Sequence, residues 1–153
     1  MSSSNPTKRH ADREIVSTRL IQASPEQVFA AFADPDRLKN WWGPNGFTNT
    51  FSEFDLKPGG TWRFTMHGPD GTDYHNTSTF DAIIKPHRII FTHQKPMHRF
   101  KMTITMEPAG PATRFSFHML FDSKEECDKV KNFVPAANEQ NFDRLEAELK
   151  RTN

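Results

Sequence analysis

The chain has 153 residues, a length at which one domain removes roughly 70% of its unfolded surface from water without disulfides. Its 20 Lys and Arg against 19 Asp and Glu leave a formal charge of +1, which argues against a nucleic-acid groove or a polybasic membrane patch. Because Cys127 is the single cysteine and no apolar run reaches the ~20 residues of a membrane span, we expect a cytoplasmic protein with no disulfide and no membrane span.

The N-terminal residues 1–12 are rich in Ser and charge and nearly free of apolar side chains. Such a stretch buries too little surface to offset the entropy of ordering, so the sequence predicts a disordered tail. Residues 13–153 are predicted to form a single domain. It opens with a β-branched run over residues 13–21 that favours a strand.

Two short helices are predicted after this strand. Ser24 stands directly before a proline and three residues before Gln27, which is the pattern of a capping box, and Asp34 precedes a second proline in the same way. Their apolar side chains should face the core: Val28, Phe29, Phe32, Leu38, Trp41 and Trp42.

Apolar and polar residues then alternate at period two, with turn residues between the runs, as in an antiparallel meander with one buried face. The predicted strands are residues 51–56, 61–66, 74–84, 88–93, 100–107 and 113–121. Their inward rows carry much of the unusual content of 14 Phe and 6 Met. In the long strand, one side is predicted to carry Asn76, Ser78, Phe80, Ala82 and Ile84.

The C-terminal segment is predicted to be helical. Ser123 and Glu126 form another capping-box pattern, and Pro135 must kink the helix or begin a new one. Beyond it, two amides share a stripe with apolar residues: Asn138, Asn141, Phe142, Leu145 and Leu149. This order predicts an α+β fold in which the last helix covers the apolar face of the sheet.

Four motifs carry a resemblance to a known superfamily. They are ASPEQVFAAFADPDRLKNWWGP, DLKPGGTWRF, KPHRIIFT and LEAEL, and the resemblance extends over residues 14–150. With them the chain resembles the START-like helix-grip (SRPBCC) superfamily. More narrowly, it is similar to the bacterial group related to the C-terminal domain of the Hsp90 ATPase activator.

The resemblance implies a curved antiparallel sheet of about six to seven strands that grips a long C-terminal helix, with two short helices after the first strand. It also implies a cavity between sheet and helix, which in many relatives holds a hydrophobic small molecule. Two departures from the group, Ala137-Asn138 in the last helix and Ser78 in the long strand, should alter the shape or polarity of that cavity.

We therefore expect a small hydrophobic, aromatic ligand between the sheet and the last helix, although the same Phe and Met rows could pack solidly together. Asn138 and Asn141 add a polar signal, because a buried amide without partners costs roughly 1–3 kcal/mol. A ligand or cavity water would satisfy them, and so would bulk water at an open cleft. The candidate ligand-binding residues are Trp42, Phe64, Met66, Phe80, Phe91, His93, Met102, Phe117, Asn138 and Asn141.

The sequence names no catalytic residue, metal site or cofactor. It contains no HExxH, GxSxG, GxGxxG or P-loop motif, and its histidines lack a metal-site spacing. This favours a non-catalytic binding protein, with two alternatives open. An aromatase/cyclase-like enzyme would polarise a carbonyl with His93 or an Asn, and an interaction module would resemble the Hsp90 activator domain. Exposed edge strands would also permit a homodimer.

Overall fold

The computed structural model describes residues 11–152. A short turn, η1 (Ala11–Arg13), leads into strand β1 (Glu14–Ile21) and helices α2 (Pro25–Ala33) and α3 (Pro35–Trp41). Then come β2 (Thr48–Phe54), β3 (Thr61–His67), β4 (Asp73–Ile84), β5 (Arg88–Lys95), β6 (Phe100–Ala109) and β7 (Ala112–Phe121), followed by helices α4 (Lys124–Val130) and α5 (Val134–Thr152). Of the expected tail, residues 1–10 lie outside the described residues, whereas 11 and 12 belong to η1.

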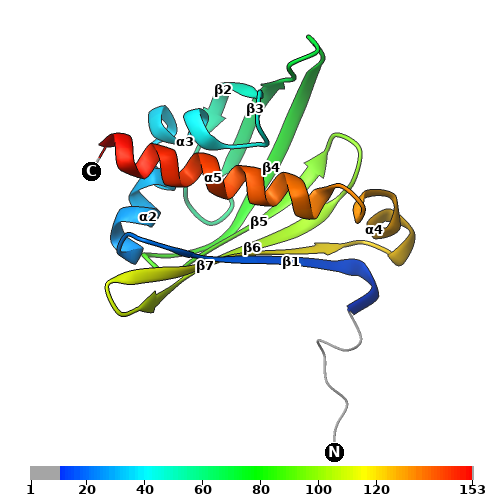
Figure 1. Cartoon of the computed structure of the whole chain (residues 1–153). Coiled ribbons are helices and arrows are strands. Elements are labelled where there is room, and N and C mark those ends of the chain that lie inside the picture. Colours follow the sequence, from blue (N-terminus) through cyan, green and yellow to red (C-terminus); the bar gives the residue numbers. More distant parts are fainter. Residues whose placement is uncertain (1–10, 153) are drawn as a thin grey trace, which may run out of the picture.

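The seven strands form one open antiparallel sheet in the order β1-β7-β6-β5-β4-β3-β2. The sheet curves around α5, which lies across its concave face, while α2 and α3 pack beside that helix at one end (Figure 1). The predicted α+β architecture, with a long C-terminal helix and two short helices after the first strand, is confirmed. Within residues 11–152, no helix combines the length and apolar character needed to cross a membrane.

The helix starts lie where the capping patterns indicate. Ser24 Oγ accepts from the Gln27 N–H at 3.2 Å, and the Gln27 side chain accepts from the Ser24 N–H at 2.9 Å, which completes the capping box. Asp34 likewise accepts from the Asp36 N–H at 2.9 Å. Each cap stabilises its helix by about 1 kcal/mol, so together they fix where α2 and α3 begin.

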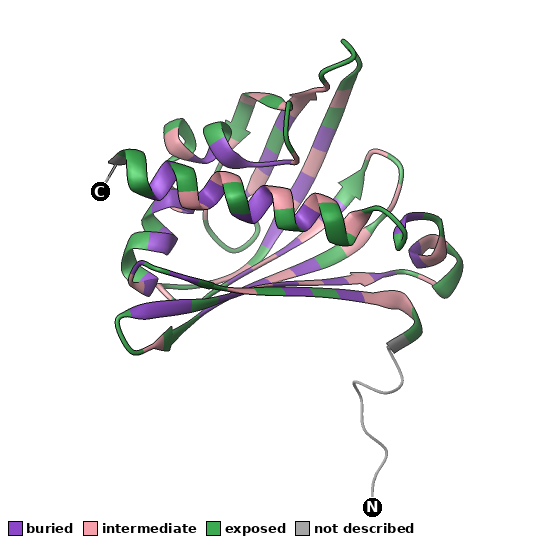
Figure 2. Ribbon diagram, viewed as in Figure 1, coloured by how far each residue is buried: buried purple, intermediate pink, exposed green. Residues whose placement is uncertain are grey.

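The inward rows of the sheet and one stripe of α5 form the core (Figure 2). The ring of Phe142 on α5 is fully buried and lies 4.9 Å from that of Phe117 and 5.4 Å from that of Phe115, both on β7. Leu145 and Leu149 continue the stripe. Burying each such side chain contributes about 1.5–3 kcal/mol, so this stripe fastens α5 to the sheet.

The boundaries of β2 differ from the prediction. The strand spans Thr48–Phe54 instead of residues 51–56, because its pairing with β3 sets Thr48 opposite His67 and Phe54 opposite Trp62. At the other end of the chain, Pro135 lies in the first turn of α5 and begins a new helix.

The predicted inward row of β4 is correct as far as Phe80 and wrong at Ile84, which is 50% exposed. A register shift against β5 falls between Phe80 and Ala82. A bulge there reverses which residues face inward, so Ile83 packs against the core in place of Ile84.

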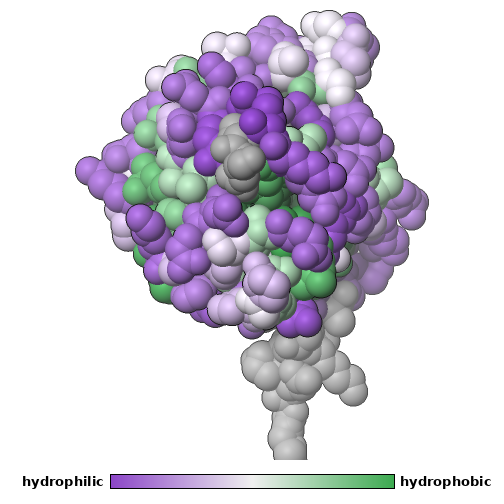
Figure 3. Space-filling view, turned by 60° about the vertical axis from the view of Figure 1, so that its left-hand side comes forward, coloured by the Kyte–Doolittle hydropathy of each residue, from purple (hydrophilic) through white to green (hydrophobic). Residues whose placement is uncertain are grey.

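Polar contacts tie α5 to the edge strand β1. Asn138 donates to Ser17 Oγ at 3.1 Å. Arg19 lies within 2.9 Å of three carboxylates of α5, those of Glu139, Asp143 and Glu146. Figure 3 views the molecule from the side of the last turns of α5, where hydrophilic side chains surround smaller hydrophobic patches.

Candidate functional site

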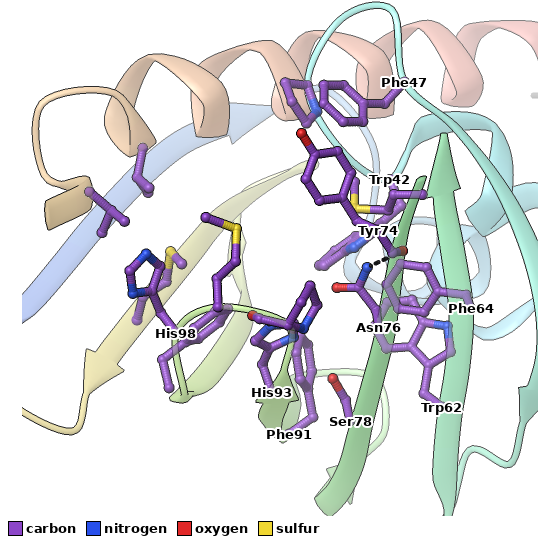
Figure 4. A pocket seen from close by; sticks show the side chains of 18 of the residues that line it. Trp42, Phe47, Trp62, Phe64, Tyr74, Asn76, Ser78, Phe91, His93 and His98 are labelled. Carbon is purple, nitrogen blue, oxygen red and sulfur yellow. Dashed lines mark hydrogen bonds between the residues drawn. The ribbon is translucent and has the colours of Figure 1, made fainter. Parts of the chain in front are cut away.

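A cavity of about 490 Å³ lies on the concave side of the sheet, beneath the N-terminal end of α5. Its floor comes from β3 to β7, its roof from the α3–β2 loop, and its mouth from the β5–β6 loop and the α4–α5 junction (Figure 4). Volumes of this size are typical of pockets that hold drug-sized molecules. The cavity is therefore large enough for a ligand of two or three rings.

Aromatic side chains form the deep wall. Trp42, the C-cap of α3, packs edge-on against Trp62 of β3 at 5.1 Å and Phe91 of β5 at 6.1 Å between ring centres. Phe64 stacks on the other side of Trp62 at 4.5 Å. These rings support one another in offset and edge-to-face geometry, so they present a preformed apolar surface to a ligand.

A row of polar side chains, Asn76, Ser78 and His93, crosses this apolar floor. Ser78 of β4 pairs with Trp62 on one side and His93 on the other, so the three side chains share one face. Asn76 lies two residues along the same strand, and its amide nitrogen donates to the Tyr74 carbonyl at 2.9 Å. All three residues of this polar row are buried and line the cavity (Figure 4).

The ring of His93 is held in one orientation. It stacks on Phe100 at 4.8 Å, and Nε2 lies 3.0 Å from the Pro96 carbonyl. Because a carbonyl only accepts, Nε2 carries the hydrogen. Burial is the main cause that lowers the pKa of His93, and the nearby His98 lowers it as well. The hydrogen bond to the Pro96 carbonyl acts in the opposite direction and offsets this only in part. The ring is therefore neutral near pH 7, with Nδ1 as its acceptor.

The mouth of the cavity exposes apolar side chains. Met97 in the β5–β6 loop is 75% exposed, and Phe133 between α4 and α5 is 55% exposed. His98 Nδ1 lies 2.8 Å from Glu126 Oε1 and so joins that loop to α4. Hydrogen bonds from His98 and Lys129 lower the pKa of Glu126.

Arg144 of α5 holds the roof. Its guanidinium donates, at 2.9 to 3.2 Å, to five backbone carbonyls at the end of α3 and in the following loop: those of Asn40, Trp42, Gly43, Pro44 and Phe47. The last carbonyls of a helix have no partner within it, so Arg144 supplies one. Burial lowers the pKa of Arg144, yet an arginine stays charged at this depth.

Gly43 allows the α3–β2 loop to approach β3 closely. Its φ is +99°, and a Cβ there would lie 2.5 Å from the terminal methyl of Met66. Only glycine adopts this backbone without strain and leaves room for Met66 in the cavity wall.

Five of the ten predicted ligand-binding residues line the cavity: Trp42, Phe64, Met66, Phe91 and His93. Three others lie in the solid core instead. Phe80 is behind Trp62, stacked at 5.9 Å, Met102 is buried on β6, and Phe117 packs under Phe142. Alternation along each strand correctly identified the face on which these residues lie. It does not distinguish the part of that face that packs in the core from the part that borders the cavity.

The two amides predicted to meet the ligand also lie outside the cavity wall, because each has a protein partner. Asn138 donates to Ser17, and it also lies 3.7 Å from the sulfur of Met119. Asn141 donates to the Trp41 carbonyl at 2.7 Å and so helps Arg144 to cap α3. In this structure the two amides therefore attach α5 to β1 and cap α3.

The sequence reasoning missed Asn76 and Ser78. The signal was present: both fall in the predicted inward row of 74–84, where polar side chains are as unexpected as on the helix stripe. Their cross-strand neighbours Phe64, Trp62 and His93 are the wall residues themselves.

Other chemistry-bearing residues stand apart from this site. Burial raises the pKa of the Cys127 thiol, so the protonated thiol is favoured over the thiolate. In the described part of the chain, no group of three or more His, Cys, Asp or Glu is arranged to hold a metal ion.

Comparison with known families identifies the fold. The family model described as Activator of Hsp90 ATPase homolog 1-like protein matches residues 22–150. The chain belongs to this family. The match spans α2 to α5 and includes the cavity, and the sequence-based resemblance to the Hsp90-activator group of the helix-grip superfamily is confirmed.

Solved structures show that the Hsp90-activator-like fold of this chain is shared by bacterial proteins. A protein from Arthrobacter aurescens aligns with a TM-score of 0.85 at 24% identity, covering 92% of this chain and 88% of its own. One from Nitrosomonas europaea gives 0.83 at 20% identity, covering 92% and 96%. Protein Ms6760 from Mycobacterium smegmatis gives 0.81 at 23% identity, covering 94% of each chain. No curated protein matches the sequence.

Proposed function

We propose that this protein binds a small hydrophobic, aromatic molecule in the cavity beneath the N-terminal end of α5, in the cytoplasm of a bacterial cell. The observation that carries the proposal is the cavity itself, which measures about 490 Å³ and is walled mainly by Trp, Phe and Met side chains. Concave, mostly apolar pockets of this size with a few polar groups are the usual binding sites for small molecules in proteins.

The character of the walls supports an aromatic ligand. Trp42, Trp62 and Phe91 offer ring edges and faces, and Met66 and Met97 offer thioethers that adapt to varied shapes. The exposed apolar mouth at Met97 and Phe133 gives such a ligand a route inward.

The first experiment is native mass spectrometry of freshly purified protein, followed by denaturation and identification of any released compound. Naphthalene then serves as a defined apolar probe, titrated by the intrinsic fluorescence of the three tryptophans, of which Trp42 and Trp62 line the cavity. We expect a dissociation constant in the micromolar range, as for two-ring ligands with about 0.5–1 kcal/mol per non-hydrogen atom.

A variant that fills the cavity provides the matched test. Val134→Phe at the cavity rim should weaken naphthalene at least tenfold, with the free energy of unfolding within about 1 kcal/mol of wild type. Val16→Phe makes the same change on β1, where the side chain is 57% exposed, and should leave binding unaltered. Equal binding by all three proteins, or no binding and no retained compound in wild type, would overturn the proposal and shift attention to the outer surface as a partner-binding site.

A further inference from the structure

Ser78 has a hydroxyl without a hydrogen-bond partner. The residue is 1% exposed, lines the cavity, and its Oγ contacts no donor or acceptor within residues 11–152. Leaving a buried hydroxyl unpaired is costly, so native interiors almost always pair it. Ser78 lines the cavity and its hydroxyl points towards it, so a molecule in the cavity is the partner that we consider (Figure 4).

The neighbours of Ser78 supply acceptors to the same space. Since the Tyr74 carbonyl can only accept, the amide nitrogen of Asn76 must face it, which turns the Asn76 carbonyl oxygen towards the cavity (Figure 4). His93 uses Nε2–H on Pro96, so Nδ1 is its acceptor, and no hydrogen bond to Nδ1 exists in the described part of the chain. The polar row thus combines one hydroxyl with two acceptors.

The cavity wall carries no formal charge of its own beyond the histidines. Within the described residues, its lining contains no Asp, Glu, Lys or Arg. His93 is neutral, and His98 at the mouth already faces Glu126. An ionised ligand would lose its hydration without gaining a counter-ion, so the site disfavours carboxylates and ammonium groups.

We propose that the ligand is a neutral phenol or aromatic alcohol whose hydroxyl docks on the polar row while its rings lie against Trp42 and Trp62. The ligand oxygen accepts from Ser78 Oγ–H and donates its own hydrogen to Asn76 Oδ1 or His93 Nδ1. This assignment rests on the proposed function, since it names the chemical class of the molecule in the same cavity.

The test compares four probes of one ring system at pH 7: naphthalene, 2-methoxynaphthalene, 2-naphthol and 2-naphthoate. A phenol is neutral at this pH. A hydroxyl that found no partner in the cavity would weaken binding relative to naphthalene, because it is better solvated in water. We expect the opposite: 2-naphthol about five- to tenfold tighter than naphthalene, 2-methoxynaphthalene between them, and 2-naphthoate weakest.

Three variants assign the effect to the polar row. Ser78→Ala removes only a hydroxyl and should bring the preference of 2-naphthol over naphthalene to about twofold or less. Asn76→Leu removes one of the two acceptors and should narrow the gap in affinity between 2-naphthol and 2-methoxynaphthalene. Ser116→Ala is the matched control, because Ser116 lies on the opposite face of the sheet, bonded to Thr18 at 2.9 Å, and should keep the full preference. Naphthalene affinity, read for every variant, reports whether the cavity is intact.

The outcomes separate this inference from the proposed function. If naphthalene binds while 2-naphthol binds no more tightly, the cavity function holds and the phenol assignment is overturned. The assignment also fails if Ser78→Ala keeps the naphthol preference, or if 2-naphthoate binds as tightly as 2-naphthol. If no probe binds, both are overturned.

Discussion

The two ends of α5 meet the same sheet and produce different interiors. Towards the C-terminus, the large side chains of Phe142, Leu145 and Leu149 are buried in the core. At the N-terminal end the helix presents Val134 and small residues, and the cavity lies between it and the sheet. One end of the helix therefore carries the large buried side chains that stabilise the domain, whereas the other end carries smaller ones and leaves a cavity.

We expect the most damaging substitution to be one in the part of the core that lies under Phe142 of α5. Phe142→Ala removes a fully buried ring that packs on Phe115 and Phe117, so the free energy of unfolding should fall by about 3–5 kcal/mol in urea titrations. Phe133→Ala at the exposed mouth serves as the comparison and should cost less than about 1 kcal/mol. Similar losses for the two variants would show that the ends of α5 do not differ in this way.

The second prediction concerns Arg144 and the α3–β2 loop, which forms the roof of the cavity. Arg144→Met leaves the carbonyls of the α3–β2 loop without their donor and should lower the free energy of unfolding by about 2–3 kcal/mol. Because the loop covers the cavity, naphthalene affinity should fall several-fold as well. Arg114→Met, at an exposed site on β7, should change neither quantity measurably. Unchanged ligand affinity in Arg144→Met would contradict the roof assignment.

A smaller effect is expected on the pH dependence of the free energy of unfolding, through His93 in the cavity wall. Burial lowers the pKa of His93 from 6.5, so between the folded-state pKa and pH 6.5 the unfolded chain binds more protons than the folded one. The contribution of His93 to stability is complete above pH 6.5 and is lost as the pH falls. His98 contributes to the same shift, whereas the lowered pKa values of Glu126 and Asp128 act below pH 4.5.

Chemical denaturation between pH 7.5 and pH 5 measures this dependence. His93→Gln keeps a donor for the Pro96 carbonyl and cannot titrate, so it should flatten the curve over that range. His75→Gln, on the exposed side of β4, should leave the curve as in wild type. An unchanged slope in His93→Gln would exclude His93 as the group responsible.

The sequence predicted the fold well because its signals are local. Ser24 and Asp34 mark helix starts by contacts within three residues, and alternation along each strand identifies the buried face. The failures needed information from other strands. The ends of β2 depend on its pairing with β3, and Ile84 turned outward because of a bulge against β5.

Only half of the predicted ligand-binding residues line the cavity, and the reason is related. A pattern of apolar residues indicates which side chains face the interior of the protein, but it does not show where that interior holds a cavity. Phe117 and Phe64 therefore look alike in the sequence, although only Phe64 lines the cavity. Asn141 looked like a ligand contact because its partner, the Trp41 carbonyl, is 100 residues away. Ser78 was passed over although the same reasoning applied to it.

The attachments of α5 give the domain an uneven stiffness. Within the described residues, the ion pairs and side-chain hydrogen bonds that join α5 to β1 and to the roof loop begin at Asn138, one turn after the helix starts. The first turn of α5, which follows α4 and borders the cavity through Val134, therefore lacks those polar contacts to β1 and the roof loop. We expect this turn to adjust more readily than the rest of the helix to whatever occupies the cavity.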